Sequence, residues 1–215
     1  MNYPELILII PVLWMSVVLH EVAHGYIALK AGDDTASLMG RLTLNPIAHI
    51  DPIGTILVPA ILGFLGLPVF GWAKPVPINP LKFKNSDWLI WVSLAGIIVN
   101  FCLVIISTIM LKILHVFHIV KVLDTSNAIF LVFFFFIQIN LVLGFFNLLP
   151  IPPLDGSKVL YQLLYKLNIR IDKYFVFLER FGFIILLIAL QFGLFEYILS
   201  PIINFILGII FMFLG

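Results

Sequence analysis

Long apolar segments dominate the sequence and constrain its fold more than any other feature. A helix that crosses a bilayer needs roughly 20 apolar residues and satisfies its backbone hydrogen bonds internally. Hydrophobic residues make up 62% of the 215 residues, charged residues 11%, and the mean hydropathy is +1.18. We therefore predict an all-α polytopic membrane protein with about 5–6 transmembrane helices. The apolar segments are residues 3–29, 53–70, 88–114, 128–149, 181–195 and 197–214.

Two of these segments are less regular than the rest. The second, residues 53–70, contains two prolines and three glycines, so it either spans the membrane or re-enters it. The fifth reaches a spanning length only if it extends back over Glu179 and Arg180. Between the helices, the prolines and alternation of residues 71–87 predict short β or extended segments near the membrane interface. We expect residues 1–215 to form a single domain.

Charge and cysteine content exclude some functions. The formal net charge is +1 and the sequence has no basic run, so we expect no nucleic acid partner. Cys102 is the single cysteine and lies in an apolar segment, which predicts a small buried hydrophobic residue and no internal disulfide.

The first apolar segment contains the sequence His20-Glu21-Val22-Ala23-His24. On a helix, the i, i+4 spacing places both imidazoles on one face, where they can bind one metal ion. Glu21 is rotated by about 100° from His20 and can act on a water molecule without being a ligand. A charged side chain in a spanning helix costs about 2.5–3.5 kcal/mol, and a metal ion offsets that cost. This HExxH pattern is typical of zinc-dependent hydrolases.

A catalytic zinc site usually has a third protein ligand. His115 and His118 end an apolar segment and His49 lies in a polar loop, so an interfacial or solvated position is the simpler explanation for each. Asp155 follows a spanning segment that ends in three prolines. It is either a ligand or the N-cap of a helix that begins near Lys158, and the residues alone leave both interpretations open.

Two distant motifs together resemble those of a known family. The HExxH lies in a membrane helix, and residues 147–156 match an NxxPxxxLDG signature. The chain thus resembles the site-2 protease family, the intramembrane metalloproteases of peptidase family M50, in the compact form without PDZ or CBS domains. The resemblance implies one zinc ion per chain, with His20, His24 and Asp155 as ligands and Glu21 as the catalytic base. It makes Asp155 a ligand first and a cap only second.

The same resemblance implies roles for two asparagines. Asn147 begins the second signature, and its amide is expected to bind the substrate backbone or the developing oxyanion. Asn100 is a weaker candidate for the same role, because an asparagine within a membrane helix also serves to join helices. The sequence departs from the family at Ile97, where a proline is common, and at Ser157, where a glycine is common.

The function implied is regulated intramembrane proteolysis. A zinc metalloendopeptidase of this type hydrolyses peptide bonds within or near transmembrane segments of membrane-protein substrates, so the expected partners are a transmembrane-helix protein substrate and the lipid bilayer. The expected location is multi-pass in a prokaryotic cell membrane. The alternative is a membrane zinc carrier or channel that uses the same histidine and aspartate ligands. A carrier has no evident need for Glu21, so this residue separates the two functions.

Overall fold

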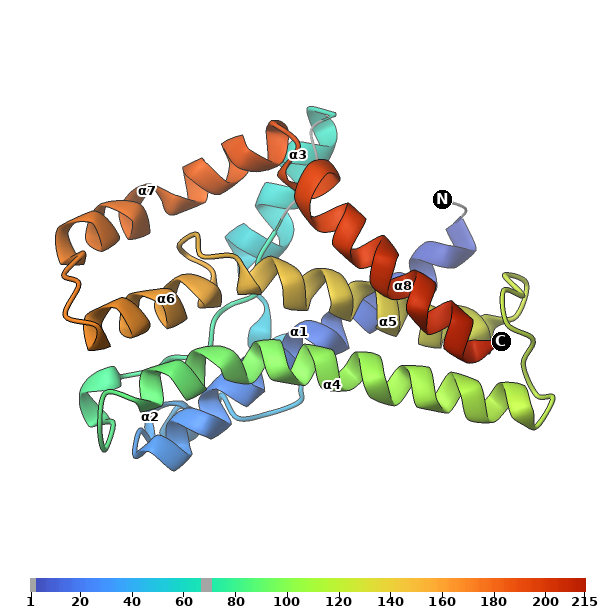
Figure 1. Ribbon diagram of the computed structural model, residues 1–215, viewed down its shortest axis with the longest axis horizontal. Coiled ribbons are helices and arrows are strands. Elements are labelled where there is room, and N and C mark those ends of the chain that lie inside the picture. The colour runs from blue at the N-terminus through green and yellow to red at the C-terminus, as the bar shows by residue number, and fades with distance from the viewer. Residues whose placement is uncertain (1–2, 67–70) are drawn as a thin grey trace.

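The computed structural model describes residues 3–66 and 71–215, and the regular elements in these ranges are all helical (Figure 1). The α-helices are α1 Tyr3–Ala31, α2 Thr35–Leu38, α3 Val58–Phe64, α4 Trp88–Val116, α5 Ala128–Leu148, α6 Asp155–Lys166, α7 Asp172–Gln191 and α8 Ser200–Leu214. Four shorter helical turns accompany them: η1 Pro46–His49, η2 Pro52–Leu57, η3 Pro80–Lys82 and η4 Phe195–Leu199.

Five of the described helices are long and apolar enough to cross a membrane. They are Ile7–Ala31, Trp88–Val116, Ala128–Leu148, Asp172–Gln191 and Phe195–Leu214. The predicted all-α polytopic class is confirmed, and α7 does extend back over Glu179 and Arg180. The second apolar segment forms a shorter helical stretch, Pro52–Phe64, and its predicted end at residues 67–70 lies outside the described residues.

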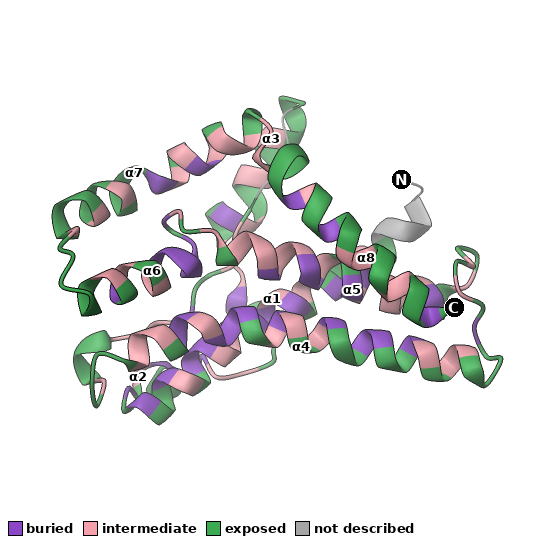
Figure 2. Ribbon diagram, viewed as in Figure 1, coloured by how far each residue is buried: buried purple, intermediate pink, exposed green. Residues whose placement is uncertain are grey.

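Helices α1, α4 and α5 pack against one another and form the centre of the molecule. Figure 2 shows buried positions along these three helices, whereas α7 and α8 are mostly exposed. Phe130, Ile137 and Leu141 of α5 follow a helical spacing, so one stripe of the helix is buried. Close approach depends on small residues: the Phe101 ring of α4 lies beside Gly144 of α5. In lipid, van der Waals packing and interhelical hydrogen bonds hold such helices together.

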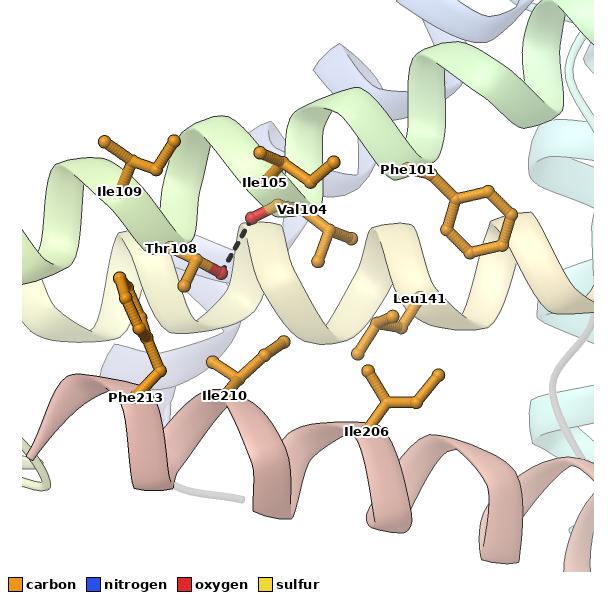
Figure 3. Close-up of a pocket in the computed structure, with 9 residues that line it drawn as sticks. All are labelled: Phe101, Val104, Ile105, Thr108, Ile109, Leu141, Ile206, Ile210 and Phe213. Carbon is orange, nitrogen blue, oxygen red and sulfur yellow. Dashed lines mark hydrogen bonds between the residues drawn. The ribbon is translucent and has the colours of Figure 1, made fainter.

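An apolar cavity of about 410 Å³ lies between α4, α5 and α8 (Figure 3). Its lining is apolar apart from Thr108, whose hydroxyl donates to the Val104 carbonyl at 2.8 Å. The lining contains no titratable or metal-ligating side chain, so the cavity offers no group for catalysis. Cys102, predicted to be buried, is exposed on α4, because it points away from the packed face of this helix.

Residues 71–79 belong to the stretch predicted to form short β or extended segments near the membrane interface. They lie beside α1 and form no strand ladder among the described residues. Backbone N–H groups attach it to its surroundings: Lys74 donates to the His49 carbonyl at 2.9 Å, and Asn79 donates to Asp33 Oδ2 at 2.6 Å. The buried Arg41 guanidinium donates to the Lys74 carbonyl at 2.9 Å. This segment is therefore held against the end of α1 and the loop that follows it.

Candidate metal centre

Helix α1 presents His20 and His24 on one buried face, and their Nε2 atoms lie 3.0 Å apart. Helix α4 fixes the other nitrogen of each ring. His24 Nδ1 lies 2.6 Å from the Val92 carbonyl, and His20 Nδ1 lies 2.6 Å from Asn100 Oδ1. A backbone carbonyl only accepts, so His24 Nδ1 carries the proton and its Nε2 keeps a free lone pair.

Asp155 is the first residue of α6 and is buried beside the two histidines. Its Oδ2 lies 3.2 Å from His20 Nε2 and 3.0 Å from His24 Nε2. The turn between α5 and α6 is tight enough that a Cβ on Gly156 would collide with the Leu148 carbonyl. The N-cap position of α6 is Leu154, so the alternative interpretation of Asp155 as a cap is wrong.

Three lone-pair-bearing atoms thus converge from two helices: His20 Nε2, His24 Nε2 and Asp155 Oδ2. Such atoms repel one another unless a proton or a cation lies between them. Ligands at 2.0–2.1 Å from a tetrahedral zinc ion are about 3.3 Å apart, close to the separations found here. Two imidazole nitrogens and one carboxylate oxygen are also a common donor set for catalytic zinc. The three residues fit a zinc ion.

Glu21 lies next to this cluster and is half-buried. Its Oε2 accepts a hydrogen bond of 2.9 Å from the backbone N–H of Val76, in the extended segment 71–79. Pro75 and Pro77 flank Val76 and have no N–H, so Val76 supplies the single backbone donor of these three residues. That donor fixes one carboxylate oxygen of Glu21 and leaves the other oxygen available.

Comparison with known proteins places the sequence in a family. A model of peptidase family M50 matches residues 110–189, which contain Asp155. A Bacillus subtilis (strain 168) protein named "Putative zinc metalloprotease YwhC" is 40% identical over 191 residues, covering 88% of this chain and 83% of that protein. The chain belongs to peptidase family M50. A Mycolicibacterium smegmatis protein named "Putative zinc metalloprotease Rip2" is 30% identical over 86% of this chain and 66% of its own length. No solved structure matches the chain.

Membership of family M50 confirms the resemblance to site-2 proteases and makes the chain a zinc metalloprotease of that type. With five helices of spanning length and composition among the described residues, it is an integral membrane protein. The M50 model begins after the HExxH, but the similarity to YwhC extends over most of the chain.

Two asparagines predicted to bind substrate occupy different environments. Asn147 is half-buried at the end of α5, and its Nδ2 donates to the Leu143 carbonyl at 3.0 Å. Asn100 is fully buried and contacts His20 directly. Their roles toward substrate stay predictions. Helix α4 continues unbroken through Ile97, and the Ser157 hydroxyl donates to the Leu154 carbonyl at 2.6 Å, so neither departure from the M50 pattern disturbs the local helix.

The other histidines weighed as ligands lie apart from the M50 centre. His49 Nε2 is 2.9 Å from the Thr43 carbonyl, and His115 Nδ1 is 3.2 Å from the Val120 carbonyl. His118 follows the end of α4 with a positive φ of 56°. Within the described residues, the one cluster of three metal-ligating side chains is that of His20, His24 and Asp155.

Sequence reasoning missed Val76 and Asn140 as neighbours of the site. Asn140 is fully buried on α5 and contacts Asn100. Its signal was available, since it is a polar residue within a phenylalanine-rich spanning segment, seven residues before Asn147. Val76 gave no side-chain signal because its contribution is a backbone N–H.

Proposed function

We propose that this protein is an intramembrane zinc metalloprotease that cleaves transmembrane segments of membrane-protein substrates. The observation that carries the proposal is the convergence of His20, His24 and Asp155 beside Glu21, with both histidines and Glu21 on a helix of spanning length. At 1.5 Å per residue, His20 lies about 20 Å from Ile7 and about 16 Å from Ala31, the two ends of the span. A peptide bond that reaches this centre therefore lies inside the hydrocarbon layer.

Each polar group of the site has a role in the proposed chemistry. His20, His24 and Asp155 would hold a zinc ion, and the bound ion would supply a Lewis acid for the substrate carbonyl and lower the pKa of water toward neutrality. Glu21 accepts the proton of the attacking water and later delivers it to the leaving amine. The Val76 N–H holds the Glu21 carboxylate in place during both transfers. Asn147 binds the substrate backbone or the oxyanion.

The proposed substrate is a single-span membrane protein whose helix unwinds locally before cleavage. A helical peptide bond is internally hydrogen-bonded and sterically shielded, so a protease cannot attack it directly. Residues 1–215 act as one domain in this proposal, within the bilayer that also holds the substrate. The bacterial relatives support a prokaryotic cell membrane as the location.

The test compares wild-type protein with Glu21→Gln, purified in detergent, on a model single-span helix. We expect cleavage by wild type, no cleavage by Glu21→Gln, and about one zinc ion per chain in both, because Glu21 is not a ligand. Glu179→Gln is the matched control, since it makes the same change on an exposed position of α7. Equal cleavage by wild type and Glu21→Gln would contradict the proposal. Zinc movement across vesicles by both proteins, without cleavage, would favour the carrier.

A further inference from the structure

A chain of buried hydrogen bonds runs from His20 into the centre of the molecule. Asn100 Oδ1 lies 2.6 Å from His20 Nδ1, and Asn100 Nδ2 donates to Asn140 Oδ1 at 3.0 Å. Asn140 Nδ2 donates to Ser16 Oγ and to the Phe136 carbonyl, both at 2.8 Å. Asn100, Asn140 and Ser16 are each fully buried, and they come from α4, α5 and α1 respectively.

The donor-to-acceptor order of these hydrogen bonds is fixed at Asn140, the asparagine farther from His20. A backbone carbonyl only accepts, so the amide group of Asn140 must direct Nδ2 to Phe136 and Oδ1 to Asn100. Asn100 must then present Nδ2 to Asn140 and Oδ1 to His20. The Ser16 hydroxyl donates to the Val12 carbonyl at 2.8 Å, so its oxygen is free to accept from Asn140. Each amide orientation follows from the one before it.

The last link determines the tautomer of His20. Because Asn100 presents an acceptor, His20 Nδ1 carries the proton and Nε2 directs its lone pair toward His24 and Asp155. His24 needs no such chain, since the Val92 carbonyl holds its Nδ1 directly and has no alternative orientation. An asparagine amide can rotate by 180° and present a donor instead, so Asn100 requires a second group to fix it.

We propose that Asn140, supported by Ser16, is a positioning residue that fixes the metal-binding tautomer of His20 through Asn100. The proposal deepens the zinc site and rests on the proposed function. Without the Asn140 acceptor, Asn100 is free to rotate and direct Nδ2 at His20. The proton then moves to Nε2, which places N–H where a metal lone pair is needed. Removing a group that orients a metal ligand through hydrogen bonds typically lowers metal affinity about 10–100-fold.

The experiment measures zinc affinity by competition with a chromophoric chelator for wild type, Asn140→Leu and Asn140→Asp. We expect Asn140→Leu to bind zinc about 10–100-fold more weakly. Asn140→Asp is expected to stay closer to wild type than Asn140→Leu, because its carboxyl group still accepts from Asn100 Nδ2. Asn204→Leu is the matched control: Asn204 donates to Ser200 Oγ at 3.2 Å on α8, an asparagine and serine pair on an exposed surface. It should leave zinc affinity unchanged.

A second measurement tests the His20 tautomer on which the proposal depends. Nitrogen NMR of 15N-histidine-labelled, zinc-loaded wild type should show His20 protonated at Nδ1, with the signal assigned by its absence in His20→Ala. Protonation at Nε2 would overturn the assignment of His20 Nε2 as a zinc ligand and the proposal with it. Unchanged zinc affinity in a folded Asn140→Leu protein would overturn the role of Asn140 alone. Wild-type protein that binds no zinc would overturn the proposed function together with it.

Discussion

Gly96→Ala tests how closely the packing of α4 on α1 determines the metal centre. A Cβ at position 96 would lie 2.5 Å from His20 Cε1 and 2.6 Å from both ring nitrogens, whereas ordinary contact begins at 3.4 Å. The imidazole must therefore retreat by about 0.9 Å, or α1 must separate from α4. Ligand distances in metal sites vary by only about 0.2 Å, so such a shift is incompatible with binding at the same point. We expect zinc affinity to fall about 100-fold or more.

The assay is chelator competition on purified protein, with thermal unfolding in detergent to confirm that the variant is folded. Gly208→Ala makes the same change on α8, where an added Cβ meets nothing within 4 Å, and it should leave both zinc affinity and unfolding unchanged. A folded Gly96→Ala protein that binds zinc as tightly as wild type would refute the reasoning. In that case the backbone of α4 would have shifted to accommodate the added Cβ, and the His20 ring would have kept its position.

Two further predictions concern the extended segment 71–79 and its contacts with Glu21 and Asp33. Val76→Pro removes the N–H that holds Glu21. Since a hydrogen bond to a charged group contributes about 1.5–3 kcal/mol, kcat should fall about 10-fold or more, with zinc content unchanged. Val76→Ala keeps the N–H and should keep more activity than Val76→Pro. Equal kcat in the two variants would contradict this role. Burial raises the pKa of Asp33, but hydrogen bonds from Thr35 and the Asn79 N–H outweigh it and hold the pKa below its usual 3.8. The stability that the Asp33 carboxylate contributes is complete above pH 3.8 and is lost as pH falls through the lowered pKa. The difference in stability between wild type and Asp33→Asn should therefore shrink on acidification. A difference that stays constant in thermal unfolding from pH 7 to pH 3 would contradict this prediction.

The sequence was sufficient where structure is local. Apolar length alone predicts the spanning helices, because a helix in lipid satisfies its own hydrogen bonds and needs no partner to be recognised. The i, i+4 spacing of His20 and His24 likewise fixes their relative position once the segment is helical. The roles of Glu21, Asn147 and Asn100 stay predictions, derived from residue chemistry and family resemblance.

Tertiary structure decided what spacing cannot encode. Asp155 lies 135 residues from His20, and its own sequence context left it as either a ligand or a cap. The turn from α5 to α6 places its carboxylate beside the histidines, with Leu154 at the N-cap position. The contact between Val76 and Glu21 is made by a backbone group, which is the same for nearly every residue type. The link from Asn140 to His20 crosses three helices. Such contacts depend on how helices rotate and approach one another, and this is settled by packing across the whole bundle, not by the residues of one segment.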